Sequence, residues 1–272
     1  MLRVSKLSIR SVIKRKQPVR GVSFSVQKGK AFTLVGETGS GKTLVAQAVC
    51  GNLSGELTAD GKIKYKGVDL VRLSRREKRR LYGKELFLLP QEPDSALDPT
   101  MRVISQVAEV FRYVRGYAVK DLHHRLAPIF SDLDLSLSEA GRLYPCQLSG
   151  GMKQRILLAI SLAVPAGFIV VDEPTKGLDK LSRTSAVHRL SNLLEKGKTL
   201  LCITHDLGVA RELGGHMAVM YDGCIVESGS VNHVLNSPRH PYTRGLIGAA
   251  PENGMIPIDE EVLAAMKQPE KK

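Results

Sequence analysis

Tryptophan is missing from the 272-residue sequence, and aromatic residues make up only 5% of it. Cysteine is nearly as scarce, because only Cys50, Cys146, Cys202 and Cys224 occur. These cysteines lie far apart and form no CxxC pair, so the sequence indicates neither a zinc site nor a disulfide framework. We therefore expect the protein to work in a reducing compartment.

Long apolar runs are missing as well. Met1–Arg10 alternates polar and apolar residues and lacks the apolar core of a signal peptide. The most apolar stretch, Ile156–Val171, is interrupted by Ser161, Pro165 and Gly167, and it is shorter than the roughly 20 residues that a bilayer requires. We predict a buried helix and a buried strand here, so any role at a membrane would depend on other chains.

Acidic residues are outnumbered by basic ones, 27 against 40, which gives a net charge of +13. Such an excess can favour nucleic acid, anionic lipid or a phosphate-rich ligand. The densest basic run is Arg72–Arg80, but it has no interleaved aromatics and no recognition-helix pattern, and the chain carries no RNA-binding signature. We predict a solvated helix face at this run and do not expect nucleic acid as a partner.

Apolar runs and glycines predict an α/β fold. Alternation at Val22–Val26 indicates a strand, and the continuous apolar run Ala31–Val35 indicates a buried one. A helix is predicted at Thr43–Cys50 and an edge strand at Ile63–Lys66, and the pattern is mostly helical from about Val103 to Ala163. Further strands are predicted at Phe168–Val171, Thr199–Thr204 and His216–Tyr221. Buried strands alternating with helices predict a largely parallel sheet, with the helical stretch as an inserted subdomain.

The segment G-E-T-G-S-G-K-T fits the pattern GxxxxGK[ST] and lies between a predicted strand and a predicted helix, as this P-loop motif requires. Its glycines let the backbone curl so that N–H groups point at phosphate oxygens, and the helix start adds its positive dipole end. Lys42 can reach the β- and γ-phosphates, and the Thr43 hydroxyl can bind Mg²⁺. The predicted nucleotide-binding residues are Gly36, Glu37, Thr38, Gly39, Ser40, Gly41, Lys42 and Thr43.

A second motif, F-I-V-V-D-E, places two acids directly after the predicted strand at Phe168–Val171. Open α/β sheets bind their ligands at the carboxyl ends of the strands. Asp172 is therefore predicted to hold Mg²⁺, and Glu173 to accept a proton from the attacking water or to orient it. Together the two motifs indicate a P-loop NTPase without saying which kind.

The segment L-S-G-G-M-K-Q-R, with Ser149, Gly150 and Gly151, combines a helix cap with two glycines and so predicts a second anion-binding site. It resembles the signature sequence of the ABC ATPases. Further matches to that family are Gln91 at its Q-loop, the D-loop residues Gly177-Leu178-Asp179, and His205 at its switch histidine. The resemblance implies a RecA-like P-loop core with an antiparallel β edge and an inserted α-helical subdomain.

The resemblance also implies a mechanism in which two ATPase subunits face each other and enclose ATP and Mg²⁺. Ser149, Gly150 and Gly151 would act on the nucleotide of the second subunit, and Asp179 of the D-loop is a further expected nucleotide-binding residue. The residues expected to act on this chain's own nucleotide are Lys42, Thr43, Gln91, Asp172, Glu173 and His205. Glu173, His205, Gln91 and Lys42 are the expected catalytic residues, and Thr43, Gln91 and Asp172 the expected Mg²⁺ ligands.

Narrower similarity is found at Pro90–Pro99, Leu143–Pro145 and Ser237–Leu246, which resemble peptide and nickel importer ATPases. This resemblance implies import of peptides, nickel or metal–chelator complexes from the cytoplasmic face of the bacterial inner membrane. The implied partners are a second ATPase subunit, identical or different, two transmembrane permeases and, indirectly, an extracytoplasmic binding protein.

The sequence departs from the family pattern in several places. No aromatic residue occurs in Met1–Ser23 to stack on adenine, so we expect Val12 or Ile13 to pack on the base. Lys176-Gly177 replaces a common Thr-Ala, and Cys146 replaces a common His. Residues 247–272 contain no cysteine, so we expect no cluster-binding tail.

The predicted domains are a nucleotide-binding domain at 1–235, with the helical subdomain inserted at about 92–164, and a C-terminal extension at 236–272, which is expected to be flexible from Pro251. Two other functions stay open. One is a soluble ABC ATPase acting on nucleic acid or the ribosome. The other is a regulatory nucleotide-binding subunit with weak turnover.

Overall fold

The computed structural model describes residues 1–13, 16–110, 112 and 122–250. The chain divides into two units. The first unit comprises Met1–Leu73 together with Leu200–Lys272, and the second comprises Ser74–Thr199.

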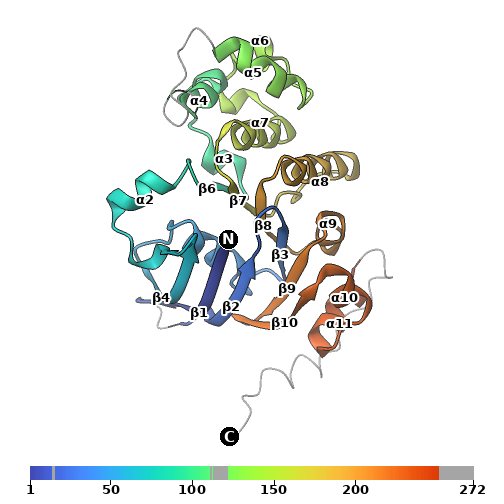
Figure 1. The fold of residues 1–272 in the computed structure, drawn as a ribbon. Helices are drawn as coiled ribbons and strands as arrows, with labels where there is room; N and C mark the ends of the chain where they lie inside the picture. The colour runs from blue at the N-terminus through green and yellow to red at the C-terminus, as the bar shows by residue number, and fades with distance from the viewer. Residues whose placement is uncertain (14–15, 111, 113–121, 251–272) are drawn as a thin grey trace, which may run out of the picture. The chain divides into compact units, whose positions relative to one another are not determined.

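The first unit contains an antiparallel sheet whose strands follow the order β2-β1-β4-β5 (Figure 1). These strands are β1 (Leu2–Ser11), β2 (Val19–Val26), β4 (Leu57–Tyr65) and β5 (Val68–Asp69). In β1 the pairing register shifts between Val4 and Leu7, where Lys6 has a φ of 49°. Because this bulge adds one residue, Leu7 and Ile9 point to the same buried face as Leu2 and Val4.

A second set of strands in the first unit follows the order β10-β9-β3-β8. They are β3 (Ala31–Val35), β8 (Thr199–Thr204), β9 (His216–Tyr221) and β10 (Cys224–Ser230). Strand β3 runs parallel to both β8 and β9, and all five of its residues are buried. A strand with parallel neighbours on both sides is typically covered on both faces, which explains the unbroken apolar sequence.

The helices of the first unit are α1 (Lys42–Val49), α9 (Leu207–Leu213), α10 (Val231–Asn236) and α11 (Pro241–Gly248), and a short 3-10 turn, η1, covers Leu70–Arg72. Helices α9, α10 and α11 contribute to one buried apolar cluster with the strands. Val35 of β3, Val219 of β9, Val234 of α10 and Tyr242 of α11 belong to this cluster. Figure 1 shows α10 and α11 beside β9 and β10. The segment after residue 236 is therefore part of this cluster as far as it is described.

The second unit is mainly helical (Figure 1). Its helices are α2 (Arg75–Leu81), α3 (Pro93–Ala96), α4 (Val103–Glu109), α5 (Leu122–Ser131), α6 (Leu137–Ala140), α7 (Gly150–Ala163) and α8 (Lys180–Glu195), with a 3-10 turn, η4, at Pro145–Gln147. Strands β6 (Leu86–Leu89) and β7 (Phe168–Asp172) pair in parallel. At the start of α2, Ser74 and Glu77 form a reciprocal capping box. Arg76, Arg79 and Arg80 are exposed, so the part of the basic run in α2 is an exposed helix face, as predicted.

The structure confirms the predicted fold class, an α/β protein with an antiparallel sheet and a helical segment. Strands β3, β8 and β9 have the predicted bounds, and β7 and α1 differ from prediction by one residue. The prediction of an edge strand at Ile63–Lys66 is wrong in its bounds, and also in its place, because β4 lies between β1 and β5. Strand β4 starts at Leu57 and ends at Tyr65, because Lys66 has a φ of 48° and turns the chain.

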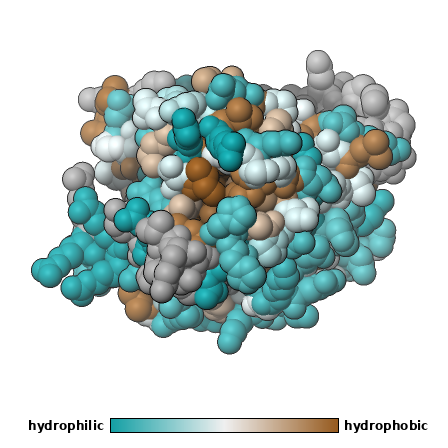
Figure 2. Space-filling view, turned by 90° about the horizontal axis from the view of Figure 1, so that it is seen from above, coloured by the Kyte–Doolittle hydropathy of each residue, from teal (hydrophilic) through white to brown (hydrophobic). Residues whose placement is uncertain are grey.

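Among the residues that the structure describes, no helix combines the length and apolar character needed to cross a bilayer. On the face shown in Figure 2, hydrophilic side chains surround a central apolar area.

Two predictions are not tested by the structure. The tail from Pro251, which is predicted to be flexible, lies outside the described residues, and the predicted domain boundaries stay predictions.

Candidate functional site

The P-loop, Gly36–Thr43, connects β3 to α1 in the first unit. Gly36 and Gly41 have φ values of 152° and 100°, a region that side chains disfavour. A Cβ on Gly36 would lie 2.1 Å from the Met220 carbonyl oxygen, and one on Gly41 would lie 2.6 Å from the Pro18 carbonyl oxygen. Glycine is therefore required at both positions by backbone conformation and by close packing within the unit.

The Lys42 ammonium group lies inside the loop. It donates hydrogen bonds to the carbonyl oxygens of Gly36 and Glu37, each at 2.7 Å, and contacts Ser40 Oγ at 3.4 Å. The side chain is only 5% exposed. The loop thus holds a buried positive charge at the position where a phosphate group would need one.

Thr43 lies in the first turn of α1. The cap residue of this helix, Gly41, has no side chain, so no side-chain hydrogen bond caps the helix start. The N-terminus of a helix presents backbone N–H groups and the positive end of its dipole. Together with Lys42, this helix start can therefore attract an anion, as the sequence predicted.

His205 follows β8, the strand that pairs with β3. Val35 is paired with Thr204. The P-loop starts directly after Val35, and His205 comes directly after Thr204. Asp206 then caps α9 by accepting hydrogen bonds from the N–H groups of Gly208 and Val209. The first unit therefore brings His205 to the same sheet edge as the P-loop.

Asp172 and Glu173 lie at the carboxyl end of β7 in the second unit, as predicted. Both carboxylates are buried, with 6% of Asp172 and 8% of Glu173 exposed. Glu173 has a φ of 49° and precedes Pro174. A non-glycine residue in this conformation is strained, and such strain clusters at functional positions.

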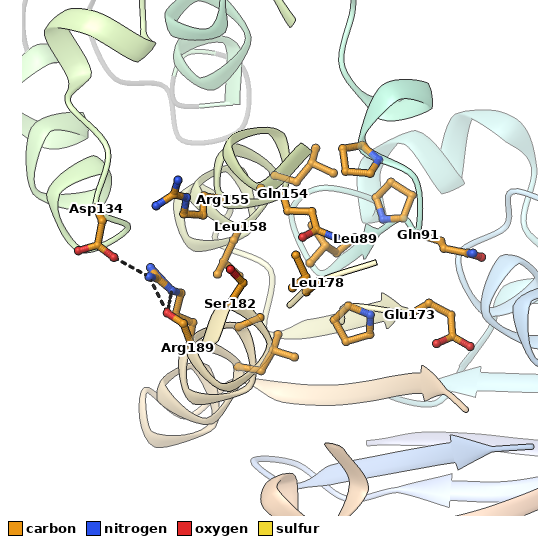
Figure 3. Close-up of a pocket in the computed structure, with 18 of the residues that line it drawn as sticks. Leu89, Gln91, Asp134, Gln154, Arg155, Leu158, Glu173, Leu178, Ser182 and Arg189 are labelled. Carbon is orange, nitrogen blue, oxygen red and sulfur yellow. Dashed lines mark hydrogen bonds and ion pairs between the residues drawn. The ribbon is translucent and has the colours of Figure 1, made fainter. Parts of the chain in front are cut away.

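A cavity of ≈ 310 Å³ opens beside Glu173 within the second unit (Figure 3). Gln91 and Glu173 lie together at one end of it. At the other end Arg189 of α8 donates a hydrogen bond of 3.0 Å to Asp134. Gly151 of the signature segment also lines this cavity. The second unit therefore brings Gln91, Glu173 and Gly151 around one cavity, whose walls are mostly apolar side chains such as Leu158 (Figure 3).

The signature segment begins α7. Ser149 is its cap and accepts a hydrogen bond of 3.3 Å from the N–H of Met152. A Cβ added to Gly150 or Gly151 would meet no atom of the described residues within 4 Å. Neither glycine is required by packing within the described chain, so both leave the helix start open to approach from outside.

Asp179 caps α8 and accepts hydrogen bonds of 3.0 Å from the N–H groups of Leu181 and Ser182. The Ser182 N–H, followed by its hydroxyl, lowers the pKa of Asp179, which therefore stays ionised. Leu181, directly after this cap region, is 83% exposed. Within this chain Asp179 shapes the D-loop, while the exposed leucine is available for contact with another molecule.

Val12, Ile13 and Tyr242 lie outside the motifs of the nucleotide site. Val12 and Ile13 are 64% and 66% exposed, so both can contact a ligand, but their packing on adenine stays a prediction. A contact between Tyr242 and the P-loop residue Glu37 was not predicted from the sequence. The only signal in the sequence is the segment Ser237–Leu246, whose similarity to importer ATPases does not indicate a contact with the P-loop.

Comparisons with known proteins identify the family of the chain. A family model described as ABC transporter matches residues 19–176, more than half of the chain. A second model, described as the C-terminal region of oligopeptide/dipeptide transporters, matches residues 226–269.

Several curated relatives are similar over most of the chain. The dipeptide transport ATP-binding protein DppD of Lactococcus lactis subsp. cremoris is 36% identical over 237 residues, covering 86% of this chain and 68% of the relative. DppD of Escherichia coli is 35% identical over 274 residues, covering 98% of this chain and 82% of the relative. The oligopeptide transport protein OppD of Bacillus subtilis is 36% identical over 239 residues, covering 86% and 67%.

Among solved structures, a dimeric ATP-binding cassette in a post-hydrolysis state with ADP and Pi is similar, with a TM-score of 0.75. Its sequence is 22% identical, and the match covers 85% of this chain and 99% of that one. This likeness supports the fold alone. Together with the family model and the relatives, it leads to one conclusion: the chain belongs to the ATP-hydrolysing subunits of the ABC transporters, in the oligopeptide/dipeptide branch.

Proposed function

We propose that this ATPase powers the import of peptides across a membrane. The observation that carries the proposal is the pair of family matches, one over the ATPase core and one over the C-terminal region. The relatives described above are named for dipeptide and oligopeptide transport. These names favour peptides over nickel or metal–chelator complexes as the cargo.

The chain's own nucleotide is proposed to bind at the P-loop. Lys42 would exchange a contact with a loop carbonyl for one with a phosphate oxygen, which keeps its charge paired throughout. The loop N–H groups from Glu37 to Thr43 and the start of α1 would hold the remaining phosphate oxygens. His205, which follows the strand next to the P-loop, would contact the terminal phosphate and respond to its loss.

Mg²⁺ is the metal that the donor set fits. The Thr43 hydroxyl, the Gln91 amide oxygen and the Asp172 carboxylate are hard oxygen donors, which Mg²⁺ prefers alongside phosphate and water. When bound, the metal neutralises charge on the phosphates. Among the described residues no group of three or more His, Cys, Asp or Glu side chains could hold a metal ion.

Glu173 is proposed to accept the proton of the attacking water or to orient that water. Its carboxylate is buried at the end of β7 and lines the same cavity as Gln91. Removal from bulk water strengthens the interactions of a carboxylate with a nearby proton donor. Gln91 would contact the metal and the water, and would carry the state of the nucleotide into the helical part of the second unit.

A second ATPase subunit is the proposed direct partner. Ser149, Gly150 and Gly151 would contact the nucleotide held by that subunit, with Asp179 of the D-loop beside the interface. The open space around both glycines supports this role, because close approach of another molecule requires it. The further proposed partners are two transmembrane permeases and, indirectly, an extracytoplasmic binding protein, with the ATPase peripheral on the cytoplasmic face of the bacterial inner membrane.

The testing experiment is the ATPase rate of the purified chain with Mg²⁺, alone and mixed with a candidate second ATPase subunit. Transport of labelled peptide into vesicles carrying the permeases is measured in parallel. Peptide uptake that depends on ATP supports the proposal. Uptake of nickel but not of peptide would overturn the cargo assignment, and recovery on ribosomes or DNA instead of with permeases would overturn transport.

A further inference from the structure

The P-loop is held from the side by the C-terminal part of the first unit. Gly36 lies so close to the Met220 carbonyl oxygen of β9 that no side chain would fit between them. The N–H of Gly223, in the turn after β9, donates a hydrogen bond of 3.1 Å to the Ser40 carbonyl oxygen. Two residues of the loop are thus fixed by a segment that follows them by more than 180 positions in the chain.

A third contact comes from Tyr242 of α11. Its hydroxyl oxygen accepts a hydrogen bond of 3.2 Å from the N–H of Glu37, the second residue of the P-loop. Tyr242 is fully buried, and its ring packs on Tyr221 with 4.4 Å between the ring centroids. Burial strongly raises the pKa of Tyr242, so the hydroxyl stays neutral and keeps its hydrogen-bonding role at physiological pH.

The segment that carries Tyr242 is fixed in turn. The carboxylate of Glu227 accepts hydrogen bonds from the N–H groups of Arg239 at 2.8 Å and His240 at 3.0 Å. His240 caps α11, because its Nδ1 accepts a hydrogen bond of 3.2 Å from the N–H of Tyr242 itself. Pro241 begins the helix, where its fixed φ suits the first turn. The tyrosine ring is therefore presented to the P-loop by a segment with little freedom.

Glu37 is held from both sides of its backbone. Its N–H donates to Tyr242, and its carbonyl oxygen accepts from the Lys42 ammonium group at 2.7 Å. Any rotation of this residue would disturb both contacts, and with them the position of the charge that faces the phosphates. We propose that Tyr242 is a positioning residue, which fixes Glu37 and so holds the P-loop in the conformation that binds nucleotide. This inference rests on the proposed nucleotide site at Gly36–Thr43.

The expected consequence is preorganisation. Without the tyrosine hydroxyl the part-buried N–H of Glu37 loses its acceptor, so the loop would relax towards conformations that hydrate this N–H. Nucleotide binding would then have to restore the loop, which weakens affinity without altering the reacting groups. Tyr242 touches neither nucleotide nor water in this account, so the rate of the chemical step at saturation should change little.

The test compares Tyr242→Phe with Tyr221→Phe. Both changes keep the packed pair of rings and remove one hydroxyl. Among the described residues the Tyr221 hydroxyl has no hydrogen-bond partner, so its loss controls for the chemistry of the substitution. The dissociation constant of a fluorescent ATP analogue is measured with the full chain, together with KM, kcat and Tm. We expect about three- to tenfold weaker binding and higher KM for Tyr242→Phe, nearly unchanged kcat, and no such change for Tyr221→Phe.

Equal affinity in Tyr242→Phe and wild type, or equal losses in both variants, would overturn the inference. A lower Tm with unchanged nucleotide affinity would also overturn it, because that result assigns Tyr242 to stability alone. Lys42→Ala separates this outcome from failure of the proposed site. If Lys42→Ala binds nucleotide normally, the site itself is wrong, whereas weak binding in Lys42→Ala with normal binding in Tyr242→Phe rejects only the role of Tyr242.

Discussion

Two glycine-containing segments of this protein differ in what surrounds them. In the P-loop, a Cβ on Gly36 or Gly41 would collide with backbone oxygens of the same unit. In the signature segment, a Cβ on Gly150 or Gly151 would meet no atom of the described residues within 4 Å. The first segment is shaped by contacts within the chain, whereas the second leaves space for something outside it. Glycine thus permits close packing within the chain at the P-loop, and leaves room for another molecule at the signature segment.

The largest expected effect comes from Glu173, the proposed acceptor of the proton from the attacking water. Glu173→Gln keeps the shape of the buried side chain but removes the carboxylate that accepts a proton. We expect the ATPase rate to fall by about 10²- to 10⁴-fold while ATP still binds. Steady-state ATPase assays and nucleotide retention on the assembled subunits measure the two properties. An unchanged rate would remove Glu173 from the mechanism.

The next effect concerns the P-loop alone. Lys42→Ala removes the buried ammonium group that now contacts the carbonyls of Gly36 and Glu37. Charge-assisted hydrogen bonds are the strong ones, so we expect nucleotide affinity to fall by about 10- to 100-fold. Equilibrium titration with a fluorescent ATP analogue gives the affinity. Exposed Lys62→Ala in the same unit is a matched control that should bind normally.

A pair of substitutions tests the glycine comparison directly. Gly41→Ala should destabilise the isolated chain by about 1–3 kcal/mol, because position 41 has a φ of 100° and faces the Pro18 carbonyl oxygen. Gly151→Ala should leave Tm equal or slightly higher, since alanine favours helix more than glycine does.

The same Gly151→Ala change should lower the ATPase rate of the assembled subunits by about 10- to 100-fold, because the methyl group obstructs approach to the helix start. Thermal unfolding and ATPase assays on both variants provide the two readouts. A stable Gly151→Ala protein with full activity would contradict the proposed contact across the interface.

The smallest expected effect is a pH dependence in the segment beside the P-loop. Burial lowers the pKa of His240, so the stability that its neutral form contributes is lost as pH falls below its ordinary value of about 6.5. Burial would raise the pKa of Glu227, but hydrogen bonds to its carboxylate, first of all that from the Arg239 N–H, together with the charge of His240, outweigh burial and lower that pKa. Stability from the Glu227 carboxylate is therefore lost at lower pH, from about 4.5 downwards.

We expect Glu227→Gln to cost about 1 kcal/mol at pH 7 and to flatten the fall of Tm at the acidic end. Thermal unfolding between pH 7 and pH 3.5 measures both features. Glu56→Gln, a change at an exposed acid in the same unit, should keep the wild-type profile. If Tm falls with pH in Glu227→Gln as steeply as in wild type, the Glu227 carboxylate does not hold the segment.

Much of the fold could be predicted because strands that are buried on both faces have continuous apolar sequences. Strands β3, β8 and β9 are nearly continuous apolar runs, and their bounds follow from the sequence. Strand β1 was not predicted, although Met1–Arg10 alternates polar and apolar residues, and the bulge at Lys6 shifts that alternation within the strand. Strand β10 was missed as well, because its residues are only partly buried or exposed.

The candidate site shows the same division between local and distant information. The positions of Lys42, Glu173 and Ser149 follow from motifs, because each motif carries its own strand and helix context. The contact from Tyr242 to Glu37 joins residues 205 positions apart. No local pattern encodes such a contact, since it depends on which strands become neighbours in the sheet.

That separation has a consequence for the protein as it is made. Synthesis proceeds at about 5–20 residues per second, so Tyr242 follows Glu37 out of the ribosome by roughly 10–40 s. Strands β8 and β9, which flank β3, also emerge late. The nascent P-loop therefore spends most of translation without the neighbours that shape it, and we expect the growing chain to acquire its affinity for nucleotide only when α11 has formed.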